Sequence, residues 1–114
     1  MKMNKFNAKK TWSELCQRTF DSKLEARRGE MLRLEELGGL IKDLQYQHKF
    51  VLCDKPKITI TIDFCYLEKG TPGKVYEDAK GVLMADFRVK MAWLKEQRGV
   101  EVRLWPDKSN PDRD

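Results

Sequence analysis

Several features that would assign this chain to a common class are missing from its sequence. It has no run of 18 apolar residues, so no membrane-spanning helix is predicted. The first ten residues are polar and basic and lack the apolar centre of a signal peptide. His48 is the single histidine, so the sequence lacks the catalytic residues of a histidine-based nuclease or a catalytic triad. No glycine-rich loop precedes a helix, so a phosphate-binding loop is excluded.

The cysteines also argue against a structural metal site. Three are present, at positions 16, 53 and 65, and their spacing does not match a zinc motif. An odd number of thiols without a signal sequence fits free cysteines in a reducing compartment. We therefore expect a cytoplasmic protein that has no membrane partner.

Charge is what the sequence does contain. Lysine and arginine number 23 and aspartate and glutamate 18 in 114 residues, giving a net charge of +5 that suits a polyanionic partner. The length fits one modest hydrophobic core. We expect a basic arm over residues 1–19, a single domain over residues 20–105 and a flexible tail over residues 106–114.

The hydrophobic periodicity predicts six elements. Ser22, three residues before Glu25, has the spacing of a helix-capping box, and Gly38-Gly39 would end that helix. Alternating apolar and polar residues predict strands over residues 44–53, 57–66, 74–80 and 100–104, and a second helix over residues 85–98. The short turn after the second strand favours an antiparallel pair there, and the second helix favours a parallel return. The expected fold is α/β, with a mixed sheet flanked by helices in the order α-β-β-β-α-β.

Charged residues stand at the ends of two predicted neighbouring strands. Asp63 interrupts an apolar and threonine-rich strand, and Asp78 and Lys80 lie two apart at the end of the next one. Residues two apart in a strand share a face, so Asp78 and Lys80 point the same way and Glu77 points to the opposite face. Two carboxylates and an ammonium at strand ends suit Mg²⁺ and a phosphate, whereas a solvated strand face is the common alternative.

Glu25 is a third acidic candidate with a second explanation. Its position in the capping box would account for it without any catalytic role. It lies near the rim of the helix face expected to be apolar, from which its carboxylate could reach the sheet. The sequence leaves both explanations open.

Taken together, these residues resemble the PD-(D/E)XK nuclease superfamily, which has a restriction-endonuclease-like fold. The likeness extends to a small, mostly phage and prophage group of nuclease-like proteins, and Holliday-junction resolvases and transposon-end endonucleases share the layout. The resemblance covers nearly the whole chain. One departure is Ile62, which stands where the family motif has proline. The segments that carry it are FDSKLEARR at 20–28, LQYQHKFVL at 44–52, DFCY and VYEDAKG between 63 and 81, and FRVKMAW at 87–93.

The resemblance implies a metal-dependent endonuclease that hydrolyses DNA phosphodiester bonds. Asp63, Asp78 and Glu25 would hold Mg²⁺ or Mn²⁺, Lys80 would orient the attacking water, and Gln47 would contact that water or the substrate. Without a base-reading device, cleavage would be non-specific or selective for branches and junctions, in phage recombination, replication or packaging. A phage-encoded protein would act in the host-cell cytoplasm. Backbone phosphates would be met by Lys5, Lys9, Lys10, Arg27, Arg28 and Lys90.

Two other functions remain open at this point. The first is an accessory DNA-binding module that keeps the fold and the acids without turnover. The second is a structural phage protein whose acids are surface residues. A resolvase would also act as a homodimer, because it cuts two strands symmetrically.

Overall fold

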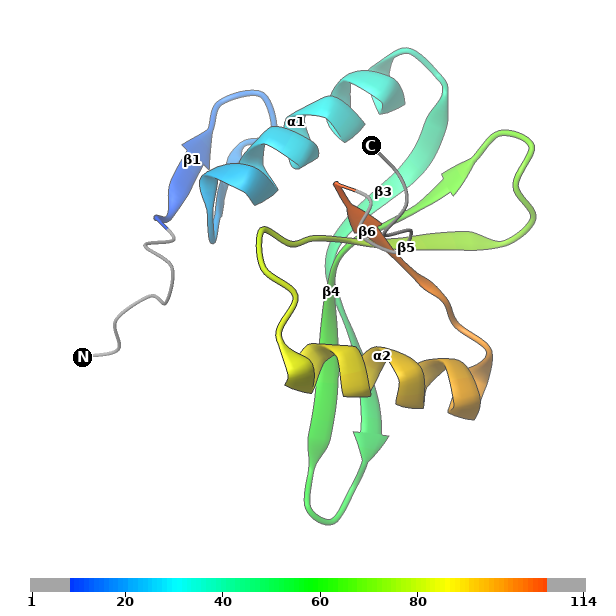
Figure 1. The fold of residues 1–114 in the computed structure, drawn as a ribbon. Coiled ribbons are helices and arrows are strands. Elements are labelled where there is room, and N and C mark those ends of the chain that lie inside the picture. Colours follow the sequence, from blue (N-terminus) through cyan, green and yellow to red (C-terminus); the bar gives the residue numbers. More distant parts are fainter. Residues whose placement is uncertain (1–8, 107–114) are drawn as a thin grey trace.

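A computed structural model describes residues 9–106 of the chain (Figure 1). The predicted order α-β-β-β-α-β is confirmed, and a short β-hairpin precedes it. The α/β fold is therefore as predicted. The elements are β1 (Thr11–Ser13), β2 (Arg18–Phe20), α1 (Lys23–Leu37), β3 (Ile41–Cys53), β4 (Ile58–Glu68), β5 (Lys74–Ala79), α2 (Ala85–Arg98) and β6 (Val102–Trp105).

The four long strands form one mixed sheet in the order β3-β4-β5-β6. The β3–β4 and β4–β5 pairs are antiparallel, because a short turn joins each of them. Helix α2 connects β5 to β6 along the chain, and β6 pairs parallel to β5. The predicted strand directions are thus confirmed, and the charged end of β5 lies beside β6, the edge strand of the sheet.

Helix α1 begins as the sequence predicts but buries a different face. The Ser22 hydroxyl accepts a hydrogen bond from the Glu25 N–H at 3.0 Å, which is the N-cap of the helix. The leucine and methionine side chains at positions 31, 34 and 37 lie on the exposed side of the helix. The buried side is formed by Glu25, Ala26, Gly29 and Leu32.

Part of the segment expected to be a basic arm, residues 1–19, is folded. Residues 11–20 form the β1–β2 hairpin, and Phe20 from this hairpin is 1% exposed. Its ring lies so close to Gly29 that a Cβ on that glycine would meet Phe20 Cζ at 2.6 Å. Three-residue strands are too short to show a hydrophobic alternation, which is why the sequence gives no sign of them. Residues 1–8, and residues 107–114 of the expected tail, lie outside the described residues.

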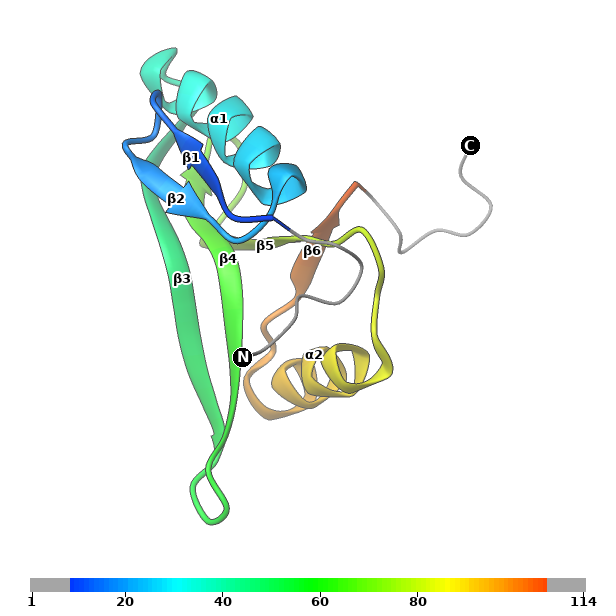
Figure 2. The same cartoon turned by 90° about the vertical axis from the view of Figure 1, so that its left-hand side faces the viewer.

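Two hydrophobic clusters hold the helices on the sheet. Phe64 and Tyr66 of β4 pack with α1 and Phe20, while Ile60 and Ile62 of the same strand pack with α2. Figure 2 shows the two helices on one side of the β3–β4 hairpin, with α1 and α2 toward its opposite ends. Charged residues between the two clusters therefore lie where the helix layer is open.

Neither α1 nor α2 has the length and apolar character of a membrane-spanning helix, and residues 9–106 contain no other helix.

Candidate metal and phosphate site

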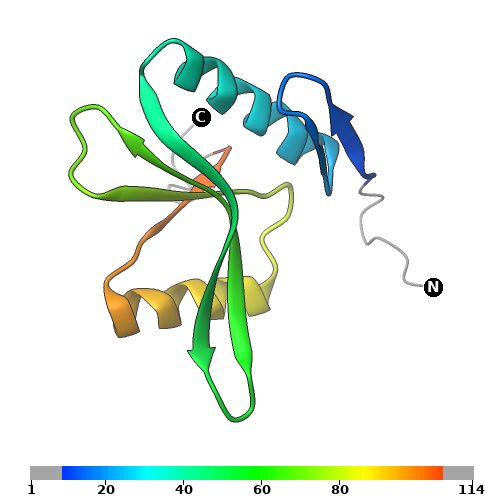
Figure 3. The same cartoon turned by 180° about the vertical axis from the view of Figure 1, so that it is seen from behind.

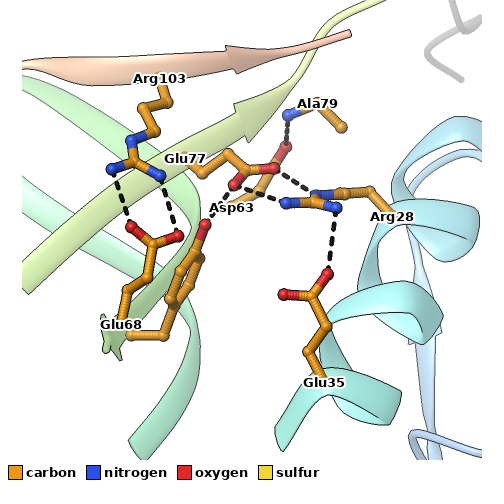
Figure 4. Close-up of polar contacts among 8 residues, drawn as sticks. Arg28, Glu35, Asp63, Glu68, Glu77, Ala79 and Arg103 are labelled. Carbon is orange, nitrogen blue, oxygen red and sulfur yellow. Dashed lines mark hydrogen bonds and ion pairs between the residues drawn. The ribbon is translucent and has the colours of Figure 1, made fainter. Parts of the chain in front are cut away.

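The two strand acids face each other where β4 and β5 separate. The last ladder pair on this side joins Phe64 to Glu77, and Asp63 and Asp78 come next. Asp63 N–H donates to Asp78 Oδ1 at 2.8 Å. In return, Ala79 N–H donates to Asp63 Oδ2 at 3.0 Å, as Figure 4 shows. Each carboxylate thus takes the place of a backbone acceptor on the other strand, which holds the two acids together.

Glu25 reaches the same place from α1. Its carboxylate Oε2 accepts a hydrogen bond from Gln47 Nε2 at 3.0 Å, and the same amide nitrogen lies 3.4 Å from Asp63 Oδ1. Ser22 caps the helix through the Glu25 backbone, so the Glu25 side chain is free to turn toward the sheet. The structure therefore lets Glu25 serve as part of the cap and as part of the acidic cluster.

Gln47 lies in the middle of β3 with a backbone φ of +57°. A side chain in this left-handed region costs about 1–3 kcal/mol, and such positions concentrate at functional sites. The neighbouring pairs Tyr46–Phe64 and His48–Ile62 keep the same register, so no residue is inserted here. Gln47 thus has an unusual backbone conformation, and its side-chain amide bridges Glu25 and Asp63.

Lys80 lies on the face that the spacing predicts. Its Nζ is 3.1 Å from Asp78 Oδ2, and the ammonium also stands over the Phe87 ring at 4.1 Å from the centroid. The ion pair lacks the geometry of a hydrogen bond, so Asp78 Oδ2 is buried without a hydrogen-bond partner among residues 9–106. A buried oxygen in this state is available to another cation or donor.

Crowding of the carboxylates disfavours their charged forms. Burial comes first, and the charges of Asp78 and Glu25 next, among the causes that raise the pKa of Asp63 from 3.8 to about 8. Burial, followed by the charge of Asp21, raises the pKa of Glu25 from 4.5 to about 7. Burial also raises the pKa of Asp78, although Lys80 acts against it. The three carboxyl groups therefore keep their protons to a higher pH than isolated carboxyl groups do.

The donor set fits a hard divalent cation. Three carboxylates offer oxygen ligands, which are those that Mg²⁺ and Mn²⁺ prefer. Asp78 Oδ2, buried and without a hydrogen bond, is the most exact match to such an ion. In residues 9–106, no three acidic, histidine or cysteine side chains already stand at metal-ligand spacing. Binding would therefore involve a rotation of the side chains of Glu25 or Asp63.

Glu77 belongs to a separate ionic network on the other face of β5 (Figure 4). Arg28 of α1 donates through Nε to Glu77 Oε2 and through Nη2 to Glu77 Oε1, the latter at 3.0 Å. Tyr66 Oη donates to the same carboxylate, and Arg28 also pairs with Glu35. This network fastens α1, which carries Glu25, to β5, which carries Asp78.

Arg18 on β2 is a site neighbour that the sequence did not reveal. Its guanidinium lies 4.1 Å from the centroid of the Tyr46 ring, and its charge lowers the pKa of Glu25 against the larger effect of burial. Its Nε is buried and has no hydrogen-bond partner among the described residues. The only sequence signal for it would have been the β1–β2 hairpin, which was too short to predict.

The predicted phosphate-binding residues have different surroundings. Lys10 lines a cleft of about 460 Å³ together with Glu25, Asp63 and Lys80, and its Nζ lies 3.6 Å from Asp21. Lys9 and Arg27 are exposed, and Lys90 is half-buried. Lys5 lies outside the described residues.

Arg28 requires a correction. We expected it to contact DNA phosphates, but its guanidinium is half-buried and bound to Glu77 and Glu35. The buried carboxylate of Glu77 on β5 neutralises the Arg28 charge. The sequence could not show that this acid lies opposite the helix.

Residues 3–109 match the model of the family described as "Protein of unknown function (DUF1064)", so the chain belongs to that family. A search of curated proteins found no match, and neither did a search of solved structures.

Proposed function

We propose that this member of the DUF1064 family is a Mg²⁺- or Mn²⁺-dependent endonuclease that hydrolyses phosphodiester bonds in DNA. The observation that carries the proposal is the meeting of Glu25, Asp63 and Asp78, from three separate elements, with Lys80 beside them. Burial first, and neighbouring acids next, raise the pKa values of Glu25 and Asp63, and shifted carboxylates in a cleft are a pattern that concentrates at functional sites. The fold order and the sequence resemblance support the same function.

Each residue has a distinct part in the proposed reaction. Glu25, Asp63 and Asp78 would hold the cation through carboxylate oxygens, and Gln47 would fix the orientation of Glu25 and Asp63. When bound, the cation supplies positive charge against the phosphate and lowers the pKa of a coordinated water. Lys80 would orient the attacking water and stabilise the negative charge that develops on the phosphate. Its contact with Phe87 limits where the ammonium can move.

The substrate is proposed to be DNA cut without reading its sequence, as a branch, a junction or a plain strand. The cleft beside the acids contains lysines at positions 10 and 80, which can meet phosphates of any sequence. Symmetric cleavage of a junction would use two copies of the chain, so a homodimer is part of this form of the proposal. A cytoplasmic location agrees with it, in the host cell if the gene belongs to a phage.

An accessory DNA-binding role is the second candidate. It is favoured by the hydrogen bonds from the Asp63 and Ala79 amides, which already occupy one oxygen of each strand acid. In this form the acids would hold β4 and β5 together where the ladder ends, and DNA would bind without being cut.

A cleavage assay separates the two candidates. Purified protein is incubated with branched, single-stranded and linear duplex DNA in Mg²⁺, Mn²⁺ or EDTA. The endonuclease proposal expects metal-dependent cleavage that is lost in Asp78→Ala and Lys80→Ala and kept in Lys69→Ala, an exposed lysine on the β4–β5 turn. Cleavage that survives both site variants would contradict the assigned residues. Binding without cleavage in every metal condition would favour the accessory module.

A further inference from the structure

The β3–β4 hairpin has one face that the described residues leave uncovered. Helix α2 packs on Phe50, Ile60 and Ile62, and α1 packs on residues farther along the same face of β4. Figure 3 shows the hairpin from behind, with no helix or strand in front of its half that reaches past α2. On this outer face Gln47 and Lys49 are exposed, and Thr59 and Thr61 are half-buried.

This open face is continuous with the acidic site. Successive side chains alternate between the faces of a strand, so Thr61 and Thr59 follow Asp63 on the same side. The register places Lys49 opposite Thr61, and Gln47 contacts Asp63 beside them. The face therefore begins at the acids and runs outward along the hairpin.

The charge on this part of the hairpin is mostly positive. Residues 47–62 contain three lysines, at positions 49, 55 and 57, against one acid, Asp54. All three lysines are exposed, and the two threonines add hydroxyl donors between them and the site. Lysines and hydroxyls in a row are typical of surfaces that bind phosphate without reading bases.

We infer that the outer face of the β3–β4 hairpin, from Gln47 to the turn at Lys55–Lys57, binds the phosphate backbone of the nucleic acid that leads away from the acidic site. The six steps from Gln47 to Cys53 span roughly 20 Å, at about 3.3 Å per step. That length matches more than half a turn of duplex DNA, which is about 34 Å. The inference deepens the proposed function, on which it rests for the path of the DNA toward the acids.

The test compares two triple variants that change the charge equally. The first is Lys49→Gln/Lys55→Gln/Lys57→Gln on the hairpin face. The matched control is Lys42→Gln/Lys69→Gln/Lys74→Gln, which removes three exposed lysines far from the hairpin turn, on β3, on the β4–β5 turn and on β5. Binding of fluorescent duplex and branched DNA is measured by anisotropy in EDTA over a range of KCl concentrations. Circular dichroism confirms that both variants fold.

Each phosphate contact adds about 0.9 to the slope of log affinity against log salt. We expect the hairpin variant to lose about 2 to 3 from this slope and the control to lose less than about 1. Equal losses in the two variants would overturn the inference, because net charge alone would then explain them. Absence of binding by the unmodified chain at low salt would overturn it as well.

The result also separates this inference from the proposed catalysis. Hairpin-dependent binding without any cleavage in Mg²⁺ would support the surface and refute the endonuclease. Cleavage that is unchanged in the hairpin variant would support the endonuclease and refute the hairpin surface. Unchanged DNA affinity together with a loss of self-association in sedimentation would assign the face to a second copy of the chain and overturn the inference.

Discussion

Two consecutive residues of β5, Glu77 and Asp78, are equally buried and have opposite surroundings. Glu77 is 2% exposed and Asp78 is 1% exposed. On one face of the strand, Glu77 accepts two hydrogen bonds from Arg28 and one from Tyr66. On the other face, Asp78 stands beside the acids Asp63 and Glu25, and one of its oxygens has no hydrogen-bond partner among the described residues.

The difference shows how a structural acid can be told from a functional one at equal burial. A buried charge is tolerated when a cation and donors satisfy it, and Glu77 meets that condition. Asp78 has a single ammonium as its counter-charge and acids as its other neighbours, and burial raises its pKa. Several acids with raised pKa values that share one cleft are the pattern expected of a functional site, and here of one that takes a cation from solution.

The largest expected effect is on catalysis, from Asp78→Asn. The substitution removes a proposed cation ligand worth several kcal/mol in the transition state, so we expect cleavage to fall by about 1,000-fold. The midpoint of thermal unfolding should stay equal or rise, because an unsatisfied buried charge is removed. Single-turnover cleavage in Mg²⁺ and calorimetry measure the two effects. Asp86→Asn, the same change at an exposed acid on α2, should alter neither.

The second effect concerns stability, from Glu77→Gln. It leaves the half-buried Arg28 guanidinium without its main counter-charge, and breaking such a pair costs about 3 kcal/mol. Urea denaturation measures the loss. The double variant Arg28→Met/Glu77→Leu should recover most of it, because neither charge then remains buried. A single variant as stable as the unmodified chain would show that the network does not hold α1 on the sheet.

The third effect is a pH dependence of stability that belongs to the Asp78 side alone. The pKa of Asp63 is raised from 3.8 to about 8 and that of Glu25 from 4.5 to about 7, by burial first and by neighbouring charges next. The folded state therefore holds protons that the unfolded chain has already released, and stability falls as the pH rises from about 4 to about 8.

Thermal unfolding in EDTA measures this slope, and saturating Mg²⁺ should flatten it. The variant Glu25→Gln/Asp63→Asn should have a markedly smaller slope, whereas Glu77→Gln should keep it. A metal-free protein whose stability is constant between pH 5 and pH 8 would contradict the assigned crowding of charge.

Much of the contrast between Glu77 and Asp78 could be predicted from the two-residue alternation of side chains in a strand. Alternation in residues 74–80 was enough to place Asp78 and Lys80 on one face and Glu77 on the other, and the structure has them so. The short connection between β4 and β5 was enough to pair the strand that bears Asp63 with the strand that bears Asp78. Local patterns predict these features because hydrogen-bonded neighbours in a hairpin are fixed by the turn.

Other parts of the site depend on contacts that no local pattern contains. The rotation of α1 is set by Phe20 against Gly29 and by Arg28 against Glu77, so a helix whose exposed side is also apolar could not be oriented from its sequence. Arg28 consequently seemed to be a phosphate ligand. The left-handed conformation of Gln47 is likewise a tertiary effect, because nothing in the residue type favours it.

The smallest expected effect comes from Gln47→Gly, which tests the role of the left-handed backbone conformation of Gln47. Glycine removes the strain at φ +57° but loses the amide bridge between Glu25 and Asp63, so the free energy of unfolding should change by less than about 1 kcal/mol. Cleavage should still fall about 10-fold, as for other residues that orient metal ligands. The matched control is Gln45→Gly, two residues away on the same strand. It should have the opposite profile, with stability lowered by about 1 kcal/mol and cleavage kept. If Gln47→Gly cleaves normally, Gln47 has no part in orienting the acids.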